Sequence, residues 1–488
     1  MSIIRNSFKL SCTAVALATT LASVPAFATP TVTLYGGGAT LPANAYVGGE
    51  WLQYTPPHRL SNTDPLNPNG SNPKSIFGIL QNHATYPSYV QYCQTGSTVG
   101  RQVITGAKPD ATSACGDYSG PTPNGFSATT ARANFGASDA PLSSSDVSTF
   151  MTNNGAVHGS PVQFPAVGGA IAVIYNNADQ TTRLNLTESQ ICQIFAGQIT
   201  NWNKIIKTLP SKPIKLVVRS DGSGTTYSWM NHLSAVCPTA HPKTVSGFTT
   251  QSVYATGAVG GVLPAGTLAV SGNGNVVTTV AATDGAIGYA EASDTKTRQD
   301  VSGITTLNWA TVQKRSNQKA VYDEFGNIVT PAVTYKKFDP FLNSPQSFKV
   351  AITSDKVITG NDANGRPVLG PVTPGAGAEG CIQLVDPNTY AIPSLTAKGD
   401  YTRYPITAIS YLLAYYKKNE TGKVKYIETL LQAPYISSNR VAGVVDTVGA
   451  GTGFSWLNFD PLDATASARI SASKPKSMVE LVPTCINF

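Results

Sequence analysis

The sequence predicts an α/β protein long enough for two domains. Two stretches far apart in the chain, residues 31–54 and 214–233, share one order: a short strand of alternating apolar residues, a glycine-rich turn and the start of a helix. A length of 488 residues allows two domains of ordinary size. With 44 Gly, 33 Pro and only 12% charged residues, the chain is rich in turns, which is typical of a loop-rich secreted protein rather than a helical bundle.

The stretch 214–233, IKLVVRSDGSGTTYSWMNHL, has the features of an anion site. Its strand leads through Arg219-Ser-Asp-Gly-Ser-Gly-Thr-Thr226 into a helix, and the first N–H groups of a helix lack partners within the helix. Arg219 adds a planar fork that can hold an oxyanion through two hydrogen bonds. The alternative from these residues alone is an ordinary turn, because Asp-Gly is a strong hairpin signal.

The N-terminal stretch repeats this pattern. Val32 and Leu34 predict a strand, residues 36–38 (Gly-Gly-Gly) predict a flexible turn, and a helix containing Tyr46 and Trp51 follows. A glycine-rich hairpin bend is the alternative here.

An export signal precedes this stretch. Arg5 and Lys9 form a positive start, residues 10–21 an apolar run, and Ala26-Phe27-Ala28 a small-residue cleavage site. We therefore expect residues 1–28 to be a signal peptide cleaved after Ala28, and the protein to be periplasmic or secreted. No other run approaches the roughly 20 apolar residues that a membrane span needs.

The charge distribution gives little support for nucleic-acid binding. The formal net charge is +7, and the Lys and Arg residues are scattered without a basic run. No cysteine or histidine spacing indicates a metal site, and we expect neither a metal nor another cofactor.

Six cysteines remain after removal of the signal peptide, and an even number in an exported chain indicates disulfides. Fifteen pairings are possible. We expect sequential pairing: Cys93–Cys115, Cys192–Cys237 and Cys381–Cys485.

Four segments occur in the order known from one protein family. They are GGGATLP (36–42), FGASDAPLS (135–143), LTESQICQIFAGQITNWN (186–203) and RSDGSGTT (219–226). Together they resemble the periplasmic phosphate-binding proteins that serve phosphate ABC transporters, and GGGATLP is most similar to the secreted DING-type members. The motif-bearing parts cover somewhat over half of the mature chain.

The resemblance implies a type II periplasmic-binding-protein fold: two α/β domains joined by two crossover strands, with a ligand cleft between them. Domain I would comprise residues 29–169 and 404–488, and domain II residues 170–403. The crossover strands are expected in the apolar runs 157–177 and 400–418.

The resemblance also implies a phosphate site, with Asp221 orienting Arg219 rather than touching the ligand. The match at Ser97 is looser, because Val99 replaces a glycine of the family motif. The implied ligands are Thr40, Leu41, Ser97, Asp139, Arg219, Ser223, Gly224 and Thr225.

Asp139 has a distinct physical role in such a site. A carboxylate repels an anion unless the anion supplies a proton for a hydrogen bond. Phosphate carries a proton near neutral pH and sulfate does not, so Asp139 would accept phosphate and reject sulfate. By itself, an Asp before Ala-Pro indicates a turn or helix cap.

The leading hypothesis is a non-catalytic, monomeric receptor that binds inorganic phosphate with high affinity, for uptake through an ABC permease or for scavenging. One rival is a secreted DING-like alkaline phosphatase with Ser223 or Thr225 as nucleophile, although no nearby residue such as His232 is placed to activate it. Another is an adhesin or matrix protein on the same fold.

Several segments fall outside the family pattern. Residues 55–88 and 106–133 are interpreted as surface insertions, with a short helix near 76–80. Residues 359–379 predict a Gly- and Pro-rich link.

Overall fold

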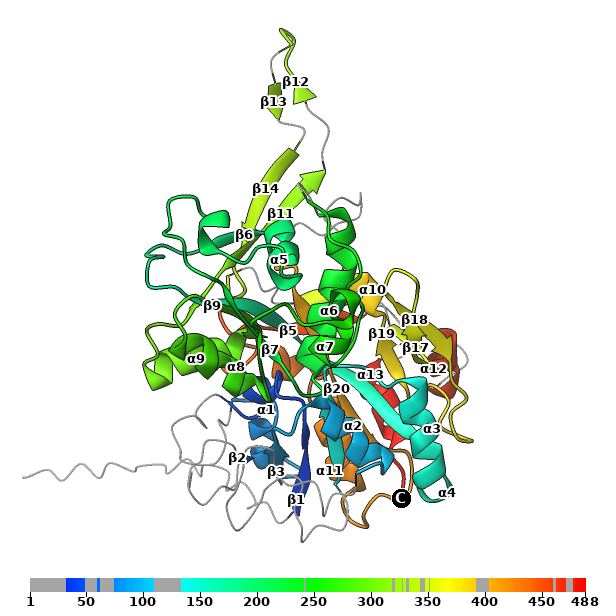
Figure 1. Cartoon of the computed structure of the whole chain (residues 1–488). Coiled ribbons are helices and arrows are strands. Elements are labelled where there is room, and N and C mark those ends of the chain that lie inside the picture. The colour runs from blue at the N-terminus through cyan, green and yellow to red at the C-terminus, as the bar shows by residue number, and fades with distance from the viewer. Residues whose placement is uncertain are drawn as a thin grey trace, which may run out of the picture.

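The computed structural model describes most of the chain (Figure 1). The described residues are 32–48, 59–61, 74–108, 133–240, 243–317, 321–326, 328–330, 333–342, 347–350, 352–391, 403–459, 462–470 and 477–488. The predicted signal peptide, Trp51, residues 55–58 and 62–73 of the first predicted insertion and residues 109–132 of the second lie outside them.

One large mixed sheet is the framework of the described chain. Its strands follow in the order β2-β3-β1-β4-β20-β5-β9-β7-β8. Their bounds are β2 Arg59–Ser61, β3 Ser88–Cys93, β1 Val32–Gly38, β4 Phe135–Ser138, β20 Thr407–Tyr415, β5 Pro161–Asn176, β9 Ala286–Glu291, β7 Lys215–Arg219 and β8 Leu268–Val270. The pairs β1–β3, β1–β4, β7–β8 and β7–β9 are parallel, as expected where helices connect the strands.

The long strand β5 joins the two ends of this sheet. Residues 161–170 pair with the antiparallel β20, and residues 171–176 pair with β9. Strand β5 therefore changes partner between Ala170 and Ile171. Both predicted crossover runs are strands, and the α/β periplasmic-binding fold is confirmed. The domain limits at 169/170 and 403/404 stay a prediction.

Shorter strands extend the sheet or form small sheets beside it. β10 (Asn308–Trp309) and β21 (Phe454–Phe459) pair with β5, and β15 (Ser347–Val350) pairs with β21. The strands β11 (Thr311–Asn317) and β14 (Val333–Phe338) project from the body, with β12 (Val321–Tyr322) and β13 (Ile328–Thr330) beyond them (Figure 1). The others are β6 Asn185–Thr187, β16 Ile352–Ser354, β17 Lys356–Asn361, β18 Pro367–Pro371 and β19 Gln383–Val385.

Helices connect and cover the strands. They are α1 Ala43–Val47, α2 Ser97–Thr105, α3 Ser144–Asn153, α4 Gly155–His158, α5 Glu188–Phe195, α6 Gly224–Val236, α7 Tyr254–Gly257, α8 Asn273–Ala282, α9 Ala292–Ser302, α10 Pro387–Tyr390, α11 Val424–Gln432, α12 Ala464–Ile470 and α13 Met478–Leu481. The local sequence explains two starts: Ser143 with Asp146, and Thr187 with Gln190, form capping boxes at α3 and α5.

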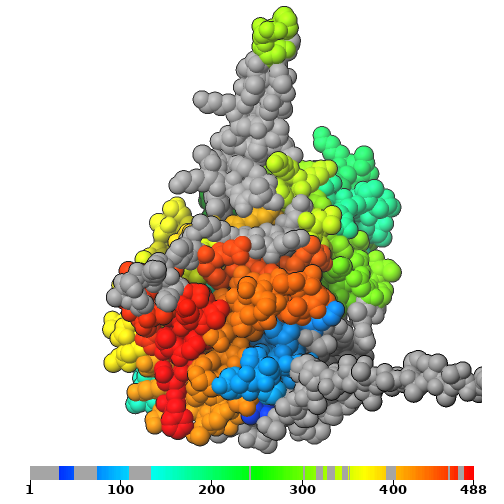
Figure 2. Space-filling view, turned by 180° about the vertical axis from the view of Figure 1, so that it is seen from behind, coloured from blue at the N-terminus to red at the C-terminus, as the bar shows by residue number. Residues whose placement is uncertain are grey.

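The C-terminal part of the chain packs on the N-terminal part. Thr447 Oγ1 donates to the carbonyl of Ala45 at 2.8 Å, and Lys74 pairs with Asp446 at 3.1 Å. Figure 2 shows the C-terminal residues, in orange and red, over much of the back face. These contacts give a physical basis for placing both ends of the chain in one unit.

The core of the described residues is one large apolar cluster, a smaller cluster beside it and a minor group around Cys93. Ile191, Ile194 and Phe195 of α5 belong to the large cluster, and so does Trp202 after this helix. The smaller cluster joins residues 350–390 to α3 and β20. This segment thus packs against elements that the predicted division assigns to domain I.

The prediction of a flexible turn at residues 36–38 is wrong. All three glycines belong to β1 and pair with β3 or β4. A Cβ on Gly37 would lie 2.3 Å from the Cys93 carbonyl oxygen, and one on Gly36 would lie 2.4 Å from the Phe135 ring. The glycines are needed for close packing of a central strand rather than for a bend.

Two further predictions change in detail. The short helix near 76–80 is a 3-10 helix over Gly78–Asn82. The predicted link 359–379 contains most of the hairpin β17–β18, whose turn closes on Gly365 at φ +76°. The Gly and Pro residues of this segment belong to a hairpin and its turn, and glycine content alone did not reveal the two strands.

Two predicted disulfides are confirmed, Cys192–Cys237 and Cys381–Cys485. Cys93 is also disulfide-bonded. Its predicted partner Cys115 lies outside the described residues, so that pairing stays a prediction.

We expect Gly37→Ala to destabilise the protein by about 1–3 kcal/mol, because the added methyl group meets backbone atoms that cannot turn away. Gly155→Ala is the matched control, since the atoms nearest its Cβ belong to the flexible side chain of Met151. Denaturant unfolding measures both. Equal stability of the two variants would contradict this role of Gly37.

Candidate functional site

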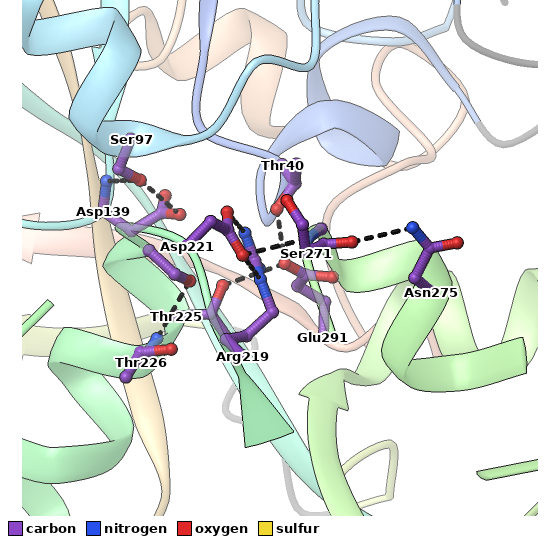
Figure 3. A network of polar contacts seen from close by, with 12 residues as sticks. Thr40, Ser97, Asp139, Arg219, Asp221, Thr225, Thr226, Ser271, Asn275 and Glu291 are labelled. Carbon is purple, nitrogen blue, oxygen red and sulfur yellow. Dashed lines mark hydrogen bonds and ion pairs between the residues drawn. The ribbon is translucent and has the colours of Figure 1, made fainter. Parts of the chain in front are cut away.

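Turns that follow the strands bring the predicted site residues together (Figure 3). Thr40 and Leu41 lie between β1 and α1, Ser97 is the first residue of α2, and Asp139 directly follows β4. Arg219 ends β7, and Ser223, the N-cap of α6, precedes Gly224 and Thr225 in its first turn. The carboxyl ends of the strands therefore supply the site, as is usual in α/β proteins.

Ser97, Asp139 and Gly224 lie close together within the site. The Ser97 hydroxyl donates to Asp139 Oδ2 at 3.2 Å and accepts from the Asp139 N–H at 3.0 Å. A Cβ on Gly224 would lie 2.4 Å from Ser97 Oγ and 2.6 Å from Asp139 Cβ. The absence of a side chain at Gly224 thus lets the start of α6 approach Asp139.

Arg219 is buried and paired with Asp221. Its side chain is 2% exposed, and its Nε donates to Asp221 Oδ1 at 2.6 Å. A second contact joins Nη2 to Asp221 Oδ2, and the N–H of Gly272 also donates to Asp221 at 2.9 Å. Burial alone would lower the pKa of Arg219, but Asp221 and then Glu291 raise it, so the guanidinium stays charged.

Glu291 is a site residue that sequence reasoning missed. It ends β9, and its Oε1 accepts from Thr40 Oγ1 at 2.7 Å and from Thr225 Oγ1 at 2.9 Å. The carboxyl group thus joins two predicted ligands from different parts of the chain. Its place in the sequence, after Ile287-Gly288-Tyr289-Ala290, does not by itself mark a ligand.

Both carboxyl groups of the site hold protons strongly. Burial raises the pKa of Asp139 from 3.8 to about 7, against the lowering effects of Ser410, Ser97, Arg219 and the Leu41 N–H. Burial and the nearby Asp294 raise the pKa of Glu291 from 4.5 to about 8. Near neutral pH Glu291 therefore largely holds its proton, while Asp139 is close to the midpoint of its titration.

Three buried polar atoms of the site have no hydrogen-bond partner among the described residues. They are Nη1 of Arg219, Oδ1 of Asp139 and Oε2 of Glu291. Ser410 and the Leu41 N–H lower the pKa of Asp139, but neither has hydrogen-bonding geometry to its Oδ1 atom. Buried polar groups are rarely unpaired in a folded protein, so these atoms point to a ligand that both accepts and donates hydrogen bonds.

A sequence model of the PBP superfamily domain matches residues 74–342, more than half of the chain. The chain belongs to the PBP superfamily. Within the described residues of this PBP-superfamily chain, no group of three or more His, Cys, Asp or Glu residues has the arrangement of a metal site. None of its described helices is both long and apolar enough to cross a membrane.

Relatives of this PBP-superfamily protein carry two kinds of name. It is 29% identical to alkaline phosphatase L of Pseudomonas aeruginosa over 307 residues, 62% of this chain and 67% of the relative. It is 37% identical to the phosphate-binding protein PstS of Xylella fastidiosa over 165 residues, only 32% of this chain and 40% of the relative.

A solved structure shares the fold. It is that of a high-affinity periplasmic phosphate-binding protein bound with phosphate, which matches 87% of this chain and 91% of its own chain at a TM-score of 0.53 and 21% identity. This PBP-superfamily chain is therefore similar in architecture to DING-type proteins.

We expect the ligand-free protein to lose stability as the pH rises from about 5 to about 8. Asp139 and Glu291 have higher pKa values folded than unfolded, so their stabilising effect is complete at acid pH and is lost as the pH rises through about 7 and about 8. Thermal unfolding at a series of pH values measures this. Asp139→Asn should reduce the loss, while Asp300→Asn, at an exposed position, should leave it unchanged.

Proposed function

We propose that this protein binds inorganic phosphate through the residues around Arg219 and Asp139. The observation that carries the proposal is that two buried atoms of opposite hydrogen-bonding character lack partners among the described residues. Nη1 of Arg219 is a donor without an acceptor, and Oδ1 of Asp139 is an acceptor without a donor. A protonated oxyanion satisfies both at once. The names of the relatives and the shared architecture support the same ligand.

The remaining predicted ligands fit this function. Ser97 and Ser223 offer hydroxyl groups, and Gly224 and Thr225 offer N–H groups at the start of α6, where the helix dipole favours an anion. Before α1, Thr40 offers its hydroxyl and N–H groups, and Leu41 offers its N–H group. Many neutral donors and one arginine would hold the ligand without a large excess of positive charge.

Phosphate would be bound outside the cytoplasm and passed to an ABC permease or retained as a scavenged nutrient. The disulfides support an oxidising compartment. We further propose that residues 29–169 with 404–488 and residues 170–403 form two lobes that close on the ligand. The tight contact of Gly224 with Ser97 and Asp139 would belong to the closed state.

Calorimetric titration of ligand-stripped protein at neutral pH should show tight binding of phosphate and none of sulfate. Asp139→Asn should weaken phosphate binding by about 10- to 100-fold and allow sulfate to bind, because an amide has a donor where the carboxylate has only acceptors.

Asp300→Asn, remote from the site and exposed, is the control and should behave as the parent protein. Binding of sulfate and phosphate with equal affinity by the parent would refute the role given to Asp139. Binding of neither anion would leave the adhesin or matrix reading in place of the receptor.

A second candidate is a phosphatase, favoured by one contact and one relative. The Thr225 hydroxyl donates to Glu291, a carboxyl group able to take up its proton, and a relative is named alkaline phosphatase L. Ser223 instead accepts from the Thr226 N–H, and His232 is neutral, because burial chiefly lowers its pKa to about 3. Neither arrangement activates Ser223.

We expect no turnover of a phosphate monoester above the background rate, because burial and Asp294 raise the pKa of Glu291 to about 8, so near neutral pH this carboxyl group already holds a proton and is a poor base for Thr225. Release of p-nitrophenol from its phosphate ester measures turnover. Turnover that Thr225→Ala abolishes, and that the exposed-site control Thr278→Ala retains, would establish the enzyme instead.

A further inference from the structure

Glu291 places a second carboxyl group in the anion site. Its side chain is held from both sides, because Thr40 comes from the β1–α1 turn and Thr225 from the first turn of α6. The backbone N–H of Glu291 donates to Asn273 Oδ1 at 3.1 Å, which fixes the end of β9. The carboxyl group is thus positioned rather than free to turn away.

Only one oxygen of Glu291 is used by these contacts. Oε1 accepts both threonine hydroxyls, while Oε2 is buried without a hydrogen-bond partner. The residue is 1% exposed, so water does not reach the group from outside. An unpaired carboxyl oxygen at such depth indicates a hydrogen-bond partner in the functional state, with a proton between the two.

The charged groups around Glu291 show what that partner is. Arg219 from β7 attracts its negative charge, and Asp294 from α9 repels it. Asp221 and Arg298 already neutralise Arg219 and Asp294 respectively. Asp139, from the turn after β4, adds a further carboxyl group close to Arg219. At alkaline pH, where both carboxyl groups are ionised, an anion without a proton would therefore face two carboxylates.

We propose that Glu291 contacts the bound phosphate through a shared proton, in addition to the proton at Asp139. This deepens and rests on the proposed phosphate function. The complex then contains two protons between protein carboxyl groups and ligand. The dihydrogen form brings both of them. The monohydrogen form brings one, and the second is already on a carboxyl group near neutral pH or is taken up from solution at alkaline pH.

The consequence is proton-linked binding at alkaline pH. Above about pH 8.5, free phosphate carries one proton and free Glu291 none, so binding takes up one proton. The dissociation constant then rises about tenfold for each pH unit. A glutamine at position 291 supplies its own N–H donor to the ligand, and this proton is no longer needed.

The experiment measures phosphate affinity of the full mature protein at about pH 8.5 and about pH 9.5 by calorimetry. We expect the dissociation constant to rise about tenfold in the parent protein and less than about twofold in Glu291→Gln. Glu428→Gln is the matched control: Glu428 is also buried, on α11, where it pairs with Lys425 at 2.8 Å. It should keep the tenfold rise.

A second measurement does not depend on the variant. Titration of the parent protein at about pH 9 in two buffers of different ionisation enthalpy gives the protons taken up, and we expect about one. No proton uptake, or an equal rise of the dissociation constant in Glu291→Gln and the parent, would overturn the role of Glu291 while phosphate binding itself stands. Absence of phosphate binding in the parent would remove the proposed function as well.

Discussion

The buried guanidinium group of Arg219 determines which charges and hydrogen-bond partners the site needs. Arg219 is almost fully inaccessible, and moving a charge into the interior is costly unless it is paired and hydrogen-bonded. Asp221 neutralises one edge of the fork and is itself held by the Gly272 N–H. Nη1 on the other edge remains without a partner. The protein is therefore electrostatically incomplete at the position where an anion would complete it.

The second constraint is steric. Glycines allow residues on α6 and on the turn before it to approach those on α2 and after β4. A Cβ on Gly222 would lie 2.4 Å from Thr98 Oγ1, and one on Gly224 would meet Ser97 and Asp139. These distances leave no room for any other residue type at either position in this arrangement. The site is thus assembled from segments far apart in the chain, through contacts that only glycine permits.

The sequence predicted the α/β fold and two disulfides because each leaves a local pattern: alternating apolar residues before glycine-rich turns, or an even number of cysteines. It failed at Gly36–Gly38, since a glycine that fits a turn also fits a strand packed against Phe135 and Cys93. It missed Glu291 because a carboxyl group becomes a site residue only through distant neighbours, Thr40 and Thr225. Contacts between distant segments leave no periodicity in the chain.

The two carboxyl groups explain how an anion site can work without a large positive charge. Asp139 and Glu291 raise the local negative charge when ionised, which would repel an unprotonated oxyanion more strongly than one arginine attracts it. Burial raises the pKa of both groups to about 7 and about 8, so near neutral pH protons on the site neutralise only part of this charge. In the proposed complex, each shared proton would also be a hydrogen bond to the ligand. Selectivity would then come from the ionised carboxyl group: an oxyanion without a proton would leave a buried carboxylate facing a negative oxygen, and that repulsion would oppose its binding.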